Sequence, residues 1–171
     1  YSTDGINWNP TSATEGSFWK SVTYGNGMFV AIAYGGTNRV MYSTDAINWT
    51  TTTATEDNDW YSVTYGDNKF VAVSYSGTNQ IMYSTDGINW TAGSAAENCQ
   101  WYDVTYGNGK FVAVAYNGTN RVMWSVGGTG ADLATLTLTN SNTYNNADGS
   151  AMAAPISQTF LAGDTVSNGA G

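Results

Sequence analysis

The chain has 171 residues and a formal net charge of −8, with five Lys and Arg residues against 13 Asp and Glu. Phosphate binding needs clustered Lys and Arg side chains, so this balance excludes nucleic acid as a partner. No apolar run approaches the ~20 residues of a membrane-spanning helix, so we expect no membrane insertion. Charged residues are 11% and aromatic residues 14% of the sequence, which favours β-structure with short polar turns.

A repeat of 41 residues dominates the chain. Its first copy runs from Trp19 to Trp49, its second from Trp60 to Trp90, and a third begins at Trp101. No segment keeps the 3.6-residue apolar period of a helix. Repeats of about 40 to 45 residues that contain several short strands are typical of β-propeller blades.

The strands can be placed in chain order within the second copy. We predict a first strand over residues 60–66, a tight hairpin turn at Asp-Asn, and a second strand over residues 69–75. Gly and Asn tolerate the positive φ of such turns. A third strand over residues 80–86 ends in a turn at Asp86, and residues 89–91 begin a fourth. The predicted fold class is therefore all-β, built from four-stranded antiparallel blades.

The two ends of the repeat array are unequal. Gly127 and Ala131 stand where the second copy has its turn Asp and its fourth-strand Trp, so the third blade lacks an outer strand. The N-terminal YSTDGINWNP carries a spare copy of both. We predict that residues 1–10 pair with a blade that lacks its fourth strand, beside residues 121–126 of the same or another chain. The propeller ring could be completed by two chains that share blades. The alternative, which we favour, is that further blades lie outside this chain.

The composition changes after residue 126. Residues 127–171 contain no Trp, Lys or Arg, and Leu alternates with Thr at LATLTLT. We predict strands near residues 133–139 and 156–161, separated by Asn- and Gly-rich loops. The predicted organisation is thus propeller blades over residues 1–126 and a small C-terminal β-element over residues 127–171, either an insertion between blades or an independent module.

The turn Ser-Thr-Asp-Gly-Ile-Asn-Trp at residues 2–8 and 84–90, with Ala in place of Gly at residues 43–49, resembles the Asp-box of sialidase-like propellers. The family pattern is Ser-x-Asp-x-Gly-x-Thr-Trp, and here one residue fewer separates Asp from Trp. The resemblance implies that this motif holds the turn and does not catalyse.

The repeat sequence YGNGKFVAVAY is similar to repeats in bacterial surface proteins and in marine bacteriophage virion proteins. The C-terminal sequence, which includes LATLTLTNSNTYNN, is similar to a module found beside such repeats in phage tail and fibre proteins. This implies virion structure or host-surface adhesion.

Catalytic chemistry is poorly supported by the residue types present. Histidine is absent, which removes Ser-His-Asp and Cys-His catalysis and any His-ligated metal. A sialidase clasps a carboxylate with three arginines, whereas this repeat carries Arg39 and Arg121 with Gln80 at the equivalent position between them. We therefore predict no catalytic residue, no metal and no cofactor.

Two acidic series also recur with the repeat. An Asp at the turn accepts backbone N–H bonds, whereas calcium needs six to eight clustered oxygens. Glutamates on successive blades should lie too far apart for the ~5 Å carboxyl pair of a retaining glycosidase. We predict a turn-holding role for the first series, Asp4, Asp45 and Asp86. The second series, Glu15, Glu56 and Glu97, is predicted to cap loops or to be solvated.

A candidate binding face is formed by the residues that open the first strands. Each first strand starts with a Trp directly after the loop from the preceding copy, and the next position varies between copies. Aromatic surfaces flanked by Asn, Gln and Arg suit sugar binding, because apolar sugar faces stack on rings while hydroxyls take hydrogen bonds. Packing between blades is the alternative role for the Trp residues. The predicted ligand-binding residues are Trp19, Lys20, Trp60, Tyr61, Trp101, Tyr102, Arg39, Gln80 and Arg121.

Two functions from different classes are consistent with these patterns. The favoured one is a non-enzymatic structural or adhesive propeller of a virion or cell surface, extracellular or virion-borne, which binds protein neighbours or surface glycans. The alternative is a fragment of a sialidase-like glycoside hydrolase whose catalytic residues lie outside this chain.

Overall fold

The computed structural model describes residues 1–126, which form three antiparallel sheets and contain no helix, hence none that could cross a membrane. In the two complete sheets, strands that follow each other in sequence are hydrogen-bonded neighbours. The predicted all-β fold of four-stranded antiparallel blades is confirmed. The strands predicted near residues 133–139 and 156–161 lie outside the described residues.

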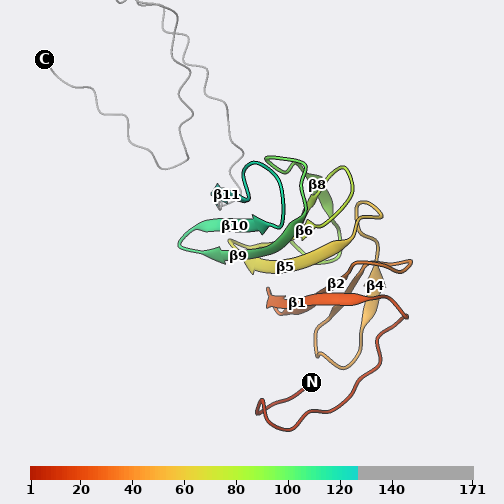
Figure 1. Ribbon diagram of the computed structural model, residues 1–171. Helices are drawn as coiled ribbons and strands as arrows, with labels where there is room; N and C mark the ends of the chain where they lie inside the picture. The colour runs from red at the N-terminus through yellow and green to blue at the C-terminus, as the bar shows by residue number, and fades with distance from the viewer. Residues whose placement is uncertain (127–171) are drawn as a thin grey trace, which may run out of the picture. The chain divides into compact units, whose positions relative to one another are not determined.

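The three sheets are the blades, and each copy of the repeat makes one (Figure 1). The third blade has three strands because nothing in the described chain pairs with the outer side of its last strand. Blade 1 contains β1 (Trp19–Gly25), β2 (Met28–Ala33), β3 (Val40–Ser43) and β4 (Thr50–Thr52); blade 2 contains β5 (Trp60–Gly66), β6 (Lys69–Ser74), β7 (Ile81–Ser84) and β8 (Thr91–Gly93); blade 3 contains β9 (Trp101–Gly107), β10 (Lys110–Ala115) and β11 (Val122–Val126).

The first hairpin of each blade uses the predicted tight turn. Asn26 and Gly27 have φ of 49° and 74°, and Asp67 and Asn68 have φ of 46° and 55°. Two-residue hairpin turns with positive φ at both positions match the right-handed twist of the flanking strands. Because Asn, Asp and Gly adopt this region at low cost, the sequence of the turn determines the register of the hairpin.

The hydrophobic core lies between successive blades. Ile32 and Val40 of blade 1 pack with Trp60, Phe70 and Met82 of blade 2, and all five side chains are fully buried. A second cluster joins blade 2 to blade 3 in the same way. Burial of large apolar side chains contributes about 1.5–3 kcal/mol each, so stacking of blades stabilises this fold.

A tyrosine fits against a glycine at each of these interfaces. A Cβ atom at Gly25 would overlap the ring of Tyr65, and one at Gly66 would overlap the ring of Tyr106. Close approach of a ring to the backbone is possible only where the side chain is a hydrogen. We call Gly25, Gly66 and the equivalent Gly107 the glycine sockets.

The Asp turns are held by the carboxylate of their Asp. Asp86 Oδ1 accepts the N–H groups of Ile88 and Asn89 at 2.9 and 2.8 Å, and its Oδ2 accepts Nδ2 of Asn89 at 2.7 Å. These bonds, led by the N–H of Asn89, hold the pKa of the Asp86 carboxyl well below its ordinary value. The same arrangement recurs at Asp4 and Asp45. This is the turn-holding role expected for the Asp series.

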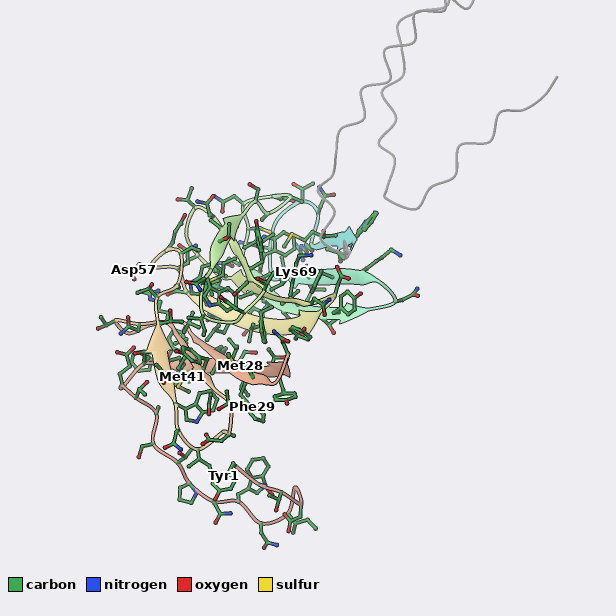
Figure 2. All side chains as sticks on the ribbon, turned by 180° about the vertical axis from the view of Figure 1, so that it is seen from behind. Tyr1, Met28, Phe29, Met41, Asp57 and Lys69 are labelled. Atoms are coloured by element: carbon green, nitrogen blue, oxygen red, sulfur yellow. The ribbon has the colours of Figure 1, made fainter. Side chains whose placement is uncertain are left out.

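The N-terminal segment does not pair with blade 3 of its own chain, so that part of the closure prediction is wrong. Tyr1 and Asn9 exchange two backbone hydrogen bonds of 2.7 and 2.8 Å, and Trp8 is 72% exposed. The segment runs beside blade 1, on the side away from blades 2 and 3 (Figure 1, Figure 2). Thr11 Oγ1 donates to the carbonyl of Ile47 at 2.7 Å, which ties the segment to blade 1.

Replacement of Asp86 by Asn tests the role of the turn. A carboxyl whose folded pKa lies below its unfolded value of about 4 stabilises the fold fully above that value and loses this contribution as the pH falls through the folded pKa. We expect Asp86→Asn to lower the free energy of unfolding at pH 7, and the difference from the parent chain to shrink between pH 5 and 2 in urea titrations. Asp4→Asn, in the exposed N-terminal turn, should change little. A difference for Asp86→Asn that is independent of pH would contradict this role.

Candidate functional site

A β-bulge singles out the second residue of each first strand. In blade 1 Trp19 pairs with Ala33 and Ser21 with Ile32, so Lys20 has no partner in the ladder. The same register shift leaves Tyr61 and Tyr102 unpaired. A bulge turns its extra residue away from the regular alternation of faces. It therefore frees these three predicted site positions from the packing between blades.

The bulge residues belong to a continuous group of aromatic rings. The Tyr61 ring stacks on Tyr75 with centroids 4.9 Å apart and meets the edge of Tyr102 at 5.2 Å. Tyr34 lies 6.1 Å from Tyr61, and Lys20 Nζ lies 4.7 Å from the Tyr61 centroid. The structure thus brings together residues of all three blades. We call Tyr34, Tyr61, Tyr75, Tyr102 and Tyr116 the tyrosine patch.

A shallow hollow of about 360 Å³ opens at the blade 3 end of this patch. Tyr102 and Tyr116 line it and are 49% and 71% exposed, while Tyr61 and Tyr75 are half-buried. Burial, with the neighbouring Tyr102 and Tyr75, raises the pKa of the Tyr61 hydroxyl. The hollow combines ring faces with hydroxyl donors and is within the size range of small-ligand sites.

Three members of the patch are not among the residues predicted from the sequence. Tyr34, Tyr75 and Tyr116 recur with the repeat, directly after β2, β6 and β10. Their recurrence is the signal that could have identified them, but the sequence pattern predicts a second strand that includes residue 75. In the structure β6 ends at Ser74, and the tyrosine that follows lies beside the bulge residue.

The tryptophans predicted as ring platforms have a different role. Trp60 and Trp101 are 0% exposed, and their Nε1 atoms donate to the carbonyls of Glu56 and Glu97 at 3.2 and 3.1 Å. Neither ring offers a face to a ligand, so the prediction is corrected to packing between blades. Trp19 is half-buried and lines a second hollow, of about 320 Å³, on the outer face of blade 1.

Arg39 and Gln80 link one blade to the loop that enters the next. Arg39 Nη1 donates to the carbonyl of Asn58 at 2.6 Å and lies 3.4 Å from Asp59 Oδ1. Gln80 is 2% exposed, and its Oε1 accepts the N–H of Cys99 at 3.0 Å. Its burial corrects the ligand-binding prediction for Gln80, whereas the ligand-binding role of Arg39 stays a prediction. Arg121 is exposed, and its Nε donates to the carbonyl of Gly118 at 3.4 Å.

The glutamate series holds the loops beside the patch. Glu97 accepts the N–H groups of Thr119 and Asn120 at 2.6 and 2.8 Å, and these bonds lower the pKa of its carboxyl. Glu15 accepts the N–H of Asn38 at 2.8 Å in blade 1. The expected loop-capping role is confirmed for both. Within residues 1–126 no group of three or more Asp, Glu or Cys side chains could hold a metal ion.

Arg39→Lys tests the structural role of this arginine. A lysine cannot reproduce the planar fork that reaches two acceptors, so we expect the free energy of unfolding to fall by about 1 kcal/mol, measured by urea unfolding. Arg121→Lys is the matched control at the equivalent position of blade 3, where a change within ~0.5 kcal/mol is expected. Equal effects of the two substitutions would show that the bond to Asn58 contributes nothing to stability.

No family model and no curated protein matches the sequence. Among solved structures, virginiamycin B lyase from Staphylococcus aureus is similar at a TM-score of 0.60 and 17% identity, over 72% of this chain and 46% of that one. YCF48 from Cyanidioschyzon merolae is similar at 0.51 and 20%, over 72% and 44%, and YCF48 bound to a D1 peptide at 0.51 and 15%, over 67% and 40%. The chain thus spans less than half the length of these structures. Their similarity confirms the β-propeller fold.

Proposed function

We propose that this chain is a non-catalytic binding module that takes a glycan in the hollow of the tyrosine patch. The observation that carries the proposal is the exposure of Tyr102 and Tyr116 around an open hollow. Several aromatic rings exposed together around a hollow are typical of interaction sites. The C–H face of a sugar covers a tyrosine ring well, and its hydroxyls find partners in phenol groups and loop amides.

The rigid surroundings of the hollow support this function. Gln100 N–H donates to Asn117 Oδ1 at 2.8 Å, and Glu97 accepts the N–H groups of Thr119 and Asn120 in the same loop. A wall that is already ordered costs less conformational entropy when a ligand binds.

The carboxylates of Asp86 and Glu97 already accept backbone hydrogen bonds, which supports a role without catalysis. General acid–base chemistry needs a carboxyl within hydrogen-bond reach of the substrate. Asp86 and Glu97 are instead committed to backbone N–H groups in their own blades. Together with the absence of histidine from the sequence, this favours binding over hydrolysis. We further propose, from the resemblance to phage and bacterial surface repeats, that the module is displayed on a virion or cell surface among protein neighbours.

Binding of oligosaccharides from bacterial surfaces tests the function. We expect the parent chain to bind one class on a glycan array, and Tyr102→Ala to weaken that binding by about 1 kcal/mol, close to fivefold in Kd, by calorimetry. Tyr83 has a similar exposure, 39%, but lies on β7 outside the patch, so Tyr83→Ala should bind like the parent. Absence of binding across the array, or equal losses in both variants, would refute the glycan function.

A further inference from the structure

The described chain carries two unpaired halves of one repeated interface. Each blade has a leading face, which packs on the blade before it, and a trailing face, which packs on the blade after it. On the leading faces, Val63 and Val104 are each 5% exposed, whereas the equivalent Val22 of blade 1 is 60% exposed. The leading face of blade 1 thus presents to solvent the residues that blades 2 and 3 bury.

The trailing face of blade 3 is uncovered in the same way. Ile32 and Val73 are 0% and 1% exposed, while the equivalent Val114 is 44% exposed. Val122 and Trp124 on β11 are also exposed, at 57% and 65%. This face continues the geometry of the two interfaces already formed within the chain, so it is shaped for another leading face.

The glycine socket of blade 3 is empty, and blade 1 has a tyrosine without a socket. A Cβ atom at Gly107 would meet nothing within 4 Å, unlike one at Gly25 or Gly66. Tyr24 occupies the position of Tyr65 and Tyr106 in the repeat and is 57% exposed. The leading face of blade 1 therefore has the tyrosine that the socket of blade 3 lacks, and the trailing face of blade 3 has the socket that this tyrosine lacks.

Hydrogen-bonding groups on the two outer faces are complementary as well. Ser21 and Ser62 accept the N–H groups of Val63 and Val104 in the following blade, at 3.3 and 3.2 Å. Asp103 stands at the equivalent position of blade 3 and is exposed. Asp103 Oδ1 already accepts the hydroxyl of Ser62 at 2.6 Å and the N–H of Val104 at 2.9 Å. By the repeat, the N–H of residue 22 at the other end is the further donor to this carboxylate, which is a stronger acceptor than a hydroxyl.

The outer strand that blade 3 lacks is also available beside blade 1. Thr52 on β4 donates to the carbonyl of Ile88 at 3.0 Å in the next blade. Thr11 makes the equivalent bond to Ile47 at 2.7 Å. Residues 9–11 therefore already lie where the fourth strand of a preceding blade belongs.

We propose that two copies of this chain dock head to tail, the trailing face of blade 3 in one copy on the leading face of blade 1 in the other. Residues 9–11 of the second copy then complete the sheet of β9, β10 and β11, and Tyr24 of that copy enters the socket at Gly107. Two such contacts close a ring of six blades, within the usual four to eight. The inference rests on the repeated interface and not on the glycan proposal. Because Val114 lines the hollow of the tyrosine patch as well as the trailing face, a docked copy and a glycan would compete there.

Sedimentation equilibrium of the full 171-residue chain tests the proposal. We expect a concentration-dependent species of twice the 18.2 kDa chain mass. Gly107→Val fills the socket without touching the rest of the blade, and Tyr24→Ala removes the ring that enters it. Each variant should raise the dimer dissociation constant at least tenfold while circular dichroism stays that of the parent.

Mixing the two variants distinguishes this contact from any other. A Gly107→Val chain keeps its tyrosine and a Tyr24→Ala chain keeps its socket, so a mixed pair has one intact contact. We expect association of the mixture to exceed that of either variant alone. A monomer at every concentration, capping by a different protein only, or a dimer unaffected by both substitutions would overturn the proposal.

Discussion

A tyrosine ring set against the backbone of a glycine in the blade before it is the contact on which this fold depends. It allows β5 to approach β1, and β9 to approach β5, closely enough for the apolar residues between them to be buried together. Any side chain at Gly25 or Gly66 would have to displace the ring. Repeat proteins are stabilised mainly by contacts between neighbouring units. Here the same contact between tyrosine and glycine holds each blade against the preceding one.

The candidate site arises from the one place where this regular packing is interrupted. The bulge at the second residue of each first strand removes Lys20, Tyr61 and Tyr102 from the ladder. Positions freed from packing can differ between blades without loss of stability, and here they change from Lys to Tyr. The tyrosines that follow the second strands then join them in a group that extends across three blades.

Spacing and turn residues were sufficient to predict the blades, because period and positive-φ positions are local properties of the chain. The roles of Trp60 and Gln80 were not predictable in the same way. Alternation of faces is read along a strand, and a bulge reverses it, so the sequence does not say that Trp60 points into the interface. The repeat identified the N-terminal turn as a spare outer element, but the blade beside which it lies depends on a tertiary contact, that of Thr11 with Ile47.

The central claim is that tyrosine rings cover the glycine sockets between blades, and the Hα chemical shifts of Gly25, Gly66 and Gly107 test it most directly. A proton held over the face of an aromatic ring resonates upfield of its ordinary position. In the Tyr24→Ala chain, whose own socket at Gly107 receives no ring, we predict upfield Hα shifts for Gly25 and Gly66 and an ordinary shift for Gly107. Ordinary shifts at all three glycines would contradict the account.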